Sequence, residues 1–85
     1  MKRILIADDH ATVRSGLRAV IEGRAGWEVV VEARDGTEAM AGAIDKRPDV
    51  AILDHSMPGM TGVEVARRIK QQQLLTEILI FTMHD

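Results

Sequence analysis

Four short, uninterrupted apolar runs constrain this chain more than any other feature of its sequence. The runs fall at residues 4–7, 29–31, 50–53 and 78–81, and a segment with helical periodicity follows each of the first three. A strand that is apolar at successive positions is buried on both faces, which is typical of a parallel sheet covered by helices. The alternation of strands and helices therefore predicts an α/β protein with a doubly wound parallel sheet.

The three intervening segments carry apolar stripes that predict amphipathic helices. The stripes expected to face the sheet are Val13, Leu17, Val20 and Ile21; Ala39, Met40, Ala43 and Ile44; and Val63, Ala66 and Ile69. Capping-box spacing marks the start of the second and third helices, at Asp35–Glu38 and Thr61–Glu64. No linker, repeat or low-complexity segment interrupts this pattern, so residues 1–85 are expected to form one domain.

Composition excludes several classes of function. Lys and Arg number 11 against 13 for Asp and Glu, which gives a formal net charge of −2. A nucleic-acid interface needs a basic face, so this chain is not expected to bind nucleic acid itself. Cysteine is absent, and no apolar run approaches the roughly 20 residues that span a bilayer. We expect a soluble cytoplasmic protein with no membrane partner.

Polar side chains follow three of the predicted strands. Asp8 and Asp9 follow the first run, Asp54 follows the third and Thr82 follows the fourth. Parallel strands of a doubly wound sheet end at one edge, where three carboxylates would repel one another unless a cation compensates. A hard divalent ion such as Mg²⁺ suits such oxygen ligands. Asp54 is then a candidate nucleophile toward phosphorus, and Thr82 offers a hydroxyl to a phosphoryl oxygen.

Each of these residues also has a simpler interpretation. Asp8 or Asp9 could cap the first helix, and Asp54 could form an Asx turn with Ser56. Thr82 could be an ordinary β-branched strand residue. The site is favoured because acidic groups end two strands, a hydroxyl ends a third, and the topology gathers all three.

Two histidines stand beside these acids in the sequence. His10 follows Asp9, and His55 follows Asp54. Imidazole is a common metal ligand, but loop histidines are mostly solvated, so neither is expected to bind a metal.

The motifs ILIADDH, AILDHSMPGMTG and ILIFT resemble the receiver domain of two-component response regulators, and the resemblance covers the entire chain. The opening Asp-Asp-His and the PGMTG loop resemble the branch that usually carries a C-terminal helix-turn-helix, which regulates transcription. The resemblance implies a flavodoxin-like fold with strand order 2-1-3-4. It implies a signalling domain, not an enzyme.

The resemblance also implies roles for individual residues. Asp54 would accept a phosphoryl group from the phosphohistidine of a sensor histidine kinase. Asp9 and Asp54 would ligate Mg²⁺ directly, Asp8 mainly through water, and Ser56 through its backbone carbonyl. Thr82 would be the switch hydroxyl that turns toward the phosphoryl group.

The sequence departs from the family pattern at several points. The fifth β-α unit, which normally brings a lysine to the site, is not in this sequence, and the three lysines present are expected at the opposite edge of the sheet: Lys2, Lys46 and Lys70. Met83 stands where a small residue is common, and His55 where an apolar residue is usual. The fourth strand would then be an exposed apolar edge, and the first helix would lose a packing neighbour. This predicts self-association through the fourth strand and the adjacent helices, for example as a dimer.

Other functions fit less well. The runner-up is a receiver fragment that keeps the fold without switching and acts as a dimerisation or assembly module. An aspartate-nucleophile phosphohydrolase would need a second Asp two residues after the nucleophile, where this chain has Ser56. A dinucleotide-binding fold is disfavoured, because the first strand is followed by Asp-Asp-His instead of G-x-G-x-x-G.

Overall fold

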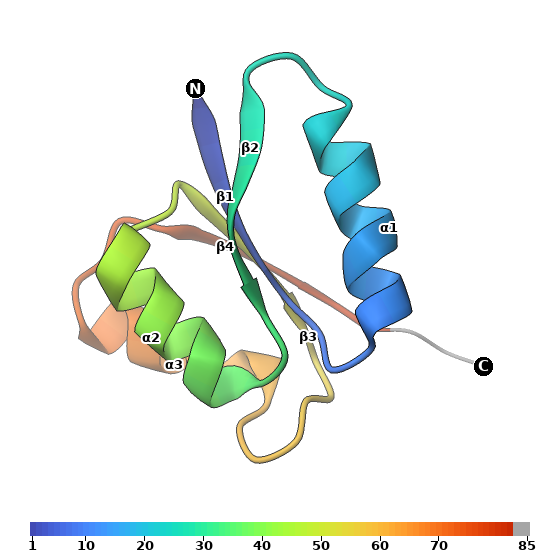
Figure 1. The fold of residues 1–85 in the computed structure, drawn as a ribbon. Coiled ribbons are helices and arrows are strands. Elements are labelled where there is room, and N and C mark those ends of the chain that lie inside the picture. The colour runs from blue at the N-terminus through green and yellow to red at the C-terminus, as the bar shows by residue number, and fades with distance from the viewer. Residues whose placement is uncertain (83–85) are drawn as a thin grey trace.

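A computed structural model of the chain describes residues 1–82 and shows four strands and three helices over that range (Figure 1). The elements in chain order are β1 (Lys2–Ala7), α1 (Ala11–Glu22), β2 (Trp27–Ala33), α2 (Gly36–Lys46), β3 (Val50–Asp54), α3 (Gly62–Gln71) and β4 (Glu77–Phe81). Each predicted strand is present, extended by one to four residues beyond its apolar run. Met83, which the family pattern singles out, lies outside the described residues.

The strands form one parallel sheet in the order β2-β1-β3-β4, which confirms the predicted topology. β1 pairs with β2 on one side and with β3 on the other, so the strand order reverses between β1 and β3. In sheets of this type, the crevice at the C-terminal ends of the two strands flanking such a reversal is where ligands bind.

Two hydrophobic cores cover the two faces of the sheet. One face packs against α1 around Ile4, Ile6, Ile21 and Val29. The other packs against α2 and α3, and its fully buried members include Leu5, Leu53, Val65 and Ile69. Figure 1 shows α1 on one side of the sheet with α2 and α3 together on the other. The doubly wound arrangement therefore follows the sequence pattern.

Three positions of the predicted stripes are wrong in detail. Val20, Ile44 and Val63 are exposed by 72%, 48% and 42%, whereas Val65, which the stripe on the third helix omitted, is fully buried. Val65 and Ile69 are four residues apart and so lie on one helical face, which turns Val63 toward solvent. Among residues 1–82, α1 is the one helix on its face of the sheet, and Val20 lies on its uncovered flank.

The starts of α2 and α3 match the predicted caps. The side chain of Asp35 accepts a hydrogen bond from the backbone N–H of Glu38 at 2.8 Å, and Thr61 Oγ1 accepts from that of Glu64 at 3.2 Å. Each cap satisfies an otherwise unpaired donor in the first turn. The second helix also gains from Glu38, which accepts from the backbone N–H of Arg34 at 2.8 Å.

β4 lies at an edge of the sheet, and part of it is exposed. Leu79 is 57% and Ile80 36% exposed.

None of the helices within residues 1–82 is both long enough and apolar enough to cross a lipid bilayer.

Candidate functional site

Three carboxyl groups meet at the C-terminal edge of the sheet. Asp8 follows β1 directly and is fully buried, and Asp54 is the last residue of β3 and is 5% exposed. Asp9 is exposed beside them. One side-chain ligand atom from each of Asp8, Asp9, His10 and Asp54 lies within 4.8 Å of the others. We call these four residues the acidic cluster.

Asp8 has one satisfied and one unsatisfied carboxylate oxygen. Oδ1 accepts a hydrogen bond from the backbone N–H of His10 at 2.7 Å. Oδ2 is buried and has no hydrogen-bond partner among residues 1–82. A buried carboxylate oxygen without a donor is energetically costly, so the chemistry of this set fits a bound cation.

Asp54 lies in an environment that disfavours its negative charge. Burial raises the pKa of the Asp54 carboxyl, and the nearby charges of Asp8 and Asp9 raise it further. The backbone N–H of Ser56 donates to Asp54 Oδ1 at 3.2 Å and acts in the opposite direction. This bond is the Asx turn of the simpler interpretation, and it coexists with the cluster. The net shift of the Asp54 pKa is upward, because burial outweighs the hydrogen bond from Ser56.

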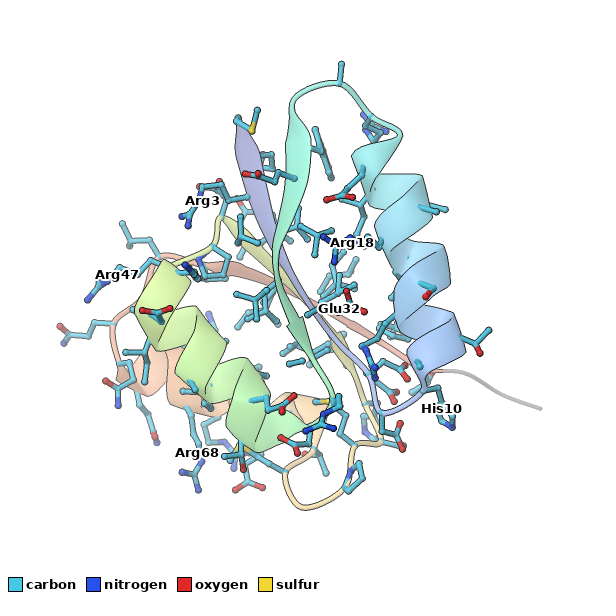
Figure 2. All side chains as sticks on the ribbon, in the orientation of Figure 1. Arg3, His10, Arg18, Glu32, Arg47 and Arg68 are labelled. Atoms are coloured by element: carbon cyan, nitrogen blue, oxygen red, sulfur yellow. The ribbon has the colours of Figure 1, made fainter. Side chains whose placement is uncertain are left out.

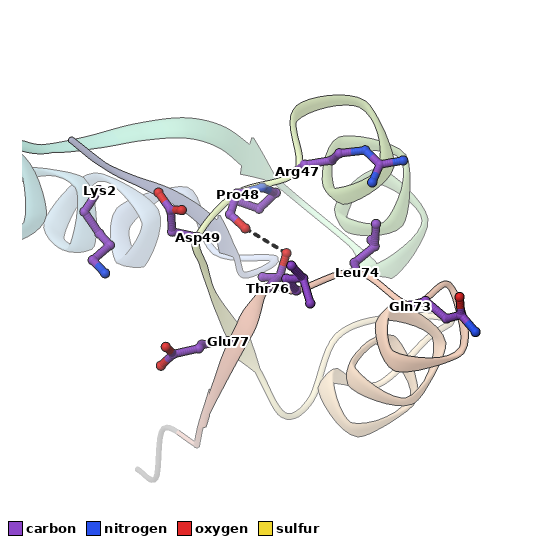
Figure 3. Close-up of a pocket in the computed structure, with 9 residues that line it drawn as sticks. Lys2, Arg47, Pro48, Asp49, Gln73, Leu74, Thr76 and Glu77 are labelled. Atoms are coloured by element: carbon purple, nitrogen blue, oxygen red, sulfur yellow. Dashed lines mark hydrogen bonds between the residues drawn. The ribbon is translucent and has the colours of Figure 1, made fainter.

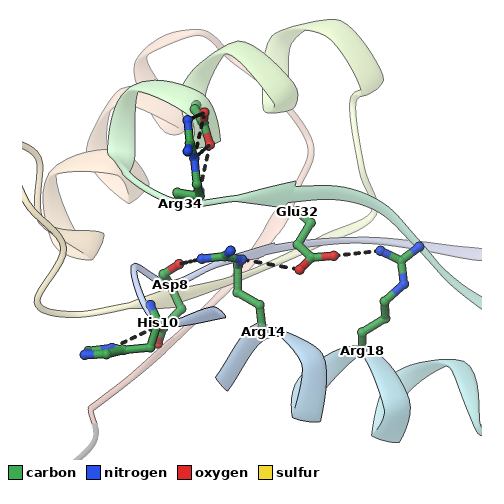
Figure 4. Close-up of polar contacts among 7 residues, drawn as sticks. Asp8, His10, Arg14, Arg18, Glu32 and Arg34 are labelled. Atoms are coloured by element: carbon green, nitrogen blue, oxygen red, sulfur yellow. Dashed lines mark hydrogen bonds and ion pairs between the residues drawn. The ribbon is translucent and has the colours of Figure 1, made fainter. Parts of the chain in front are cut away.

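Arg14 supports the loop between β1 and α1. Its Nη1 donates to the backbone carbonyl of Asp8 at 2.8 Å, and its Nε lies 3.3 Å from Glu32 Oε1 (Figure 4). Glu32 on β2 is also paired with Arg18 Nη1 at 2.6 Å. This network was not predicted from the sequence, because arginines on the polar face of a helix are usually solvated. The available signal was Glu32, one of two acidic residues within an otherwise apolar strand.

The two histidines differ in position. His10 Nδ1 lies 3.1 Å from Asp8 Oδ1 and 3.1 Å from Asp9 Oδ1, so its ring is part of the acidic cluster. Figure 2 shows His10 at the N-terminal start of α1, where the loop from β1 leads into the helix. His55 Nδ1 instead lies 3.4 Å from Ser56 Oγ, and His55 is not a member of the cluster.

Thr82 and Ser56 lie at the same edge of the sheet. Thr82 follows Phe81, which pairs with Asp54 across β3 and β4, and the Phe81 carbonyl accepts from the His55 backbone N–H at 2.8 Å. Both Thr82 and Ser56 are exposed. The topology thus brings Thr82 to the strand end beside that of Asp54, as predicted.

The start of α3 approaches the backbone of Asp54 closely. A Cβ added to Gly62 would lie 2.5 Å from the Asp54 carbonyl oxygen, which is closer than real contacts allow. The Gly62 backbone N–H donates to the His55 carbonyl at 3.2 Å. A glycine is therefore required here for α3 to begin against the strand end that carries Asp54.

The opposite edge of the sheet has a different character. A surface hollow there brings together two basic and two acidic side chains, those of Lys2, Arg47, Asp49 and Glu77 (Figure 3). Lys2 begins β1, and Lys46 and Lys70 lie in the last turns of α2 and α3. All three lysines are therefore remote from the acidic cluster, as expected from the sequence.

Comparison with known proteins is consistent with this geometry. Residues 4–85 match the model of the response regulator receiver domain family. The oxygen regulatory protein NreC of Staphylococcus epidermidis is 45% identical over 84 residues, which are 98% of this chain and 38% of NreC. The phosphate regulon transcriptional regulatory protein PhoB of Pseudomonas aeruginosa is 39% identical over 82 residues, which are 96% of this chain and 35% of PhoB.

Solved structures give the same result. A DNA-binding response regulator of the LuxR family from Staphylococcus aureus superposes with a TM-score of 0.92 at 30% identity. The match covers 100% of this chain and 71% of that one. Against the curated relatives, in contrast, this chain spans only about two fifths of their length or less.

Proposed function

This chain belongs to the response regulator receiver domain family, and on that premise we propose that Asp54 accepts a phosphoryl group from the phosphohistidine of a sensor histidine kinase. The observation that carries the proposal is the meeting of Asp8, Asp9 and Asp54 in one cluster at the end of β1 and β3. We infer a signalling domain that acts in the cytoplasm, with no turnover of a substrate of its own.

The reaction that we propose is a transfer between two protein side chains. An oxygen of the ionised Asp54 carboxylate attacks phosphorus, the bond from phosphorus to the imidazole nitrogen of the kinase breaks, and that nitrogen keeps the bonding electron pair. The product is an acyl phosphate on Asp54 and a free kinase histidine. Asp54 suits this role because it is the last residue of β3 and lies within the cluster. A hydrogen bond from the backbone N–H of Ser56 orients its Oδ1.

A divalent cation, most simply Mg²⁺, is part of this proposal. Asp9 and Asp54 would hold it directly, Asp8 mainly through water, and Ser56 through its backbone carbonyl. Support comes from the buried, unpartnered Asp8 Oδ2 and from the charges of Asp8 and Asp9, which add to the effect of burial in raising the pKa of Asp54. When bound, Mg²⁺ would neutralise negative charge on the transferring phosphoryl group.

Thr82 is proposed as the hydroxyl that responds to phosphorylation. It stands one residue beyond the Phe81–Asp54 pair, and its side chain is exposed and free of the packed core. A hydroxyl at this position can donate to a phosphoryl oxygen on Asp54. In the longer relatives the signal would reach a transcriptional output, and we propose that phosphorylation of Asp54 serves the regulation of transcription here as well.

Self-association of the 85-residue chain is a separate proposal. Leu79 and Ile80 are exposed on β4, and the outer backbone groups of an edge strand are available to a second strand. A second copy of the same edge is the partner that we propose for it.

A phosphorylation experiment tests the main proposal. The chain is incubated with Mg²⁺ and acetyl phosphate, and covalent phosphate is measured by intact mass and by its lability to hydroxylamine. We expect one hydroxylamine-labile phosphate in the unsubstituted chain and in Asp45→Asn, which removes an exposed carboxylate near the end of α2. Asp54→Asn should carry none. Labelling that persists in Asp54→Asn, or no labelling of a folded chain that binds Mg²⁺, would contradict the proposal.

A further inference from the structure

The acidic cluster contains a nitrogen donor as well as carboxylates. We propose that His10 supplies an imidazole ligand to the cation site, so that the cluster selects later transition-metal ions such as Co²⁺ over Mg²⁺ more strongly than carboxylates alone would. The inference rests on the cation site of the proposed function and deepens it. It concerns this chain's own residue at position 10, which the sequence alone gave no reason to prefer.

The positions of the donor atoms fit coordination. His10 Nδ1 lies 3.1 Å from Asp8 Oδ1 and 3.1 Å from Asp9 Oδ1. Adjacent ligands of an octahedral ion bound at about 2.1 Å are about 3 Å apart, so His10 Nδ1 and the directly binding Asp9 Oδ1 have the separation of neighbouring ligands. Asp54 completes the group, with all four ligand atoms within 4.8 Å of one another.

An unsatisfied atom provides a second, independent observation. A protonated His10 paired with Asp8 and Asp9 would account for the two short contacts, but it leaves Asp8 Oδ2 buried and unpartnered within the described chain. Asp8 itself is fully buried, so water at the surface does not relieve that oxygen. A cation held by the cluster would compensate the whole Asp8 carboxylate, including Oδ2.

Ligand chemistry determines which ions benefit. Mg²⁺ prefers oxygen ligands and retains several waters, so it gains little from a nitrogen donor. Mn²⁺ is also well served by carboxylates, whereas imidazole suits the later ions of the series, and affinity for such sites rises from Mn²⁺ through Co²⁺ to Ni²⁺ and Cu²⁺. The His10 side chain is 69% exposed, so its ring can bind the ion or move away from it without disturbing the core.

His55 offers a matched control. It is also an exposed histidine next to a cluster aspartate in the sequence, but its ring lies beside Ser56 Oγ and outside the cluster. Replacing His55 therefore removes one imidazole next to a cluster aspartate, as replacing His10 does, but it does not remove a proposed metal ligand.

The experiment measures coordination without any phosphodonor, so it is independent of whether Asp54 is phosphorylated. Mn²⁺, Co²⁺ and Mg²⁺ affinities are measured by calorimetry for the unsubstituted chain, His10→Ala, His10→Gln and His55→Ala, with folding checked by circular dichroism. Electron spin echo modulation of bound Mn²⁺ reports a directly coordinated nitrogen.

We expect nitrogen modulation in the unsubstituted chain and in His55→Ala, and none in either His10 variant. The His10 variants should bind Co²⁺ about tenfold more weakly, lose less affinity for Mn²⁺, and keep Mg²⁺ affinity within about twofold. Three results would overturn the inference: no nitrogen modulation in the unsubstituted chain, modulation that survives in His10→Ala, or an equal loss of affinity for all three ions. If Mg²⁺ itself fails to bind, the cation site of the proposed function fails as well.

Discussion

The guanidinium of Arg14 donates a hydrogen bond to the backbone carbonyl of Asp8 at 2.8 Å, which ties α1 to the loop that carries two cluster aspartates. The Arg14 side chain is only 12% exposed, and its second contact, to Glu32 on β2, holds the guanidinium in place. Arg14 is thus a positioning residue for the acidic cluster: it fixes the backbone of Asp8 and does not touch a carboxylate of the cluster.

Replacement of Arg14 should therefore cost more than replacement of its neighbour Arg18. Arg14→Gln leaves a buried Asp8 carbonyl and Glu32 with poorer partners, so the free energy of unfolding should fall by about 1–3 kcal/mol. Arg18 is 46% exposed, and its ion-pair partners among residues 1–82 are two glutamates, so Arg18→Gln should cost less than about 1 kcal/mol. Urea denaturation of both variants checks this. Equal losses in the free energy of unfolding would show that the hydrogen bond from Arg14 to the Asp8 carbonyl adds nothing to stability.

The pH dependence of stability should reveal the environment of Asp54. Burial and the charges of Asp8 and Asp9 raise the pKa of Asp54, so the folded chain holds this proton more tightly than the unfolded chain does. The resulting contribution to stability is complete below the unfolded value of about 4 and is lost as pH rises through the raised pKa. Without metal, Asp54→Asn should therefore be more stable than the unsubstituted chain at neutral pH.

Thermal melts in the presence of a chelator, from about pH 4 to pH 8, measure this difference. The advantage of Asp54→Asn should shrink toward acidic pH, and added Mg²⁺ should reduce it at neutral pH by stabilising the unsubstituted chain. An advantage that does not change with pH, or one that Mg²⁺ leaves intact, would argue against an uncompensated carboxylate at this position.

The close approach of α3 to Asp54 predicts an unusually sensitive glycine. Gly62→Ala places a Cβ against the Asp54 carbonyl, so α3 or the strand end must move, at a cost of about 1–3 kcal/mol. Gly16 in α1 has no atom within 4 Å of an added Cβ, and Gly16→Ala should instead stabilise by about 0.5–1 kcal/mol. Chemical denaturation compares the two. If Gly62→Ala left the free energy of unfolding unchanged, the end of β3 would be able to move away from the added Cβ at no cost.

The exposed edge of β4 should govern self-association of the 85-residue chain. Leu79→Lys places a charge on that edge and should lower the average mass in sedimentation velocity toward that of a single chain. Val20→Lys, at an even more exposed apolar position on α1, should leave the distribution unchanged. If the unsubstituted chain already sediments as a uniform monomer, the self-association proposal is wrong.

Much of this arrangement could be predicted from the sequence, because it depends on patterns along the chain. Continuous apolar runs predicted the parallel strands, and the topology then placed Asp8 and Asp54 at one edge. The predicted buried face of α3 was wrong because it followed the three-residue spacing of Val63, Ala66 and Ile69. The four-residue spacing of Val65 and Ile69 is the one that faces the sheet.

The supporting contacts were harder to predict for a different reason. The Arg14–Glu32 pair and the approach of Gly62 to Asp54 join residues that are distant in the sequence. The position of His10 depends on how the loop after β1 turns, which the hydrogen bond from His10 N–H to Asp8 Oδ1 determines. Such contacts carry no periodic signal, so local sequence patterns do not reveal them.

The most direct test of the account is a double-mutant cycle for Mg²⁺ binding between Asp9 and Asp54. Calorimetry measures the affinity of the unsubstituted chain, Asp9→Asn, Asp54→Asn and the double variant, with Asp45→Asn as a charge control. The account predicts that the two aspartates share one ion, so either single substitution removes most of the affinity and the double variant loses little more, a coupling above about 1 kcal/mol. Losses that are small and additive, and that match the control, would contradict it.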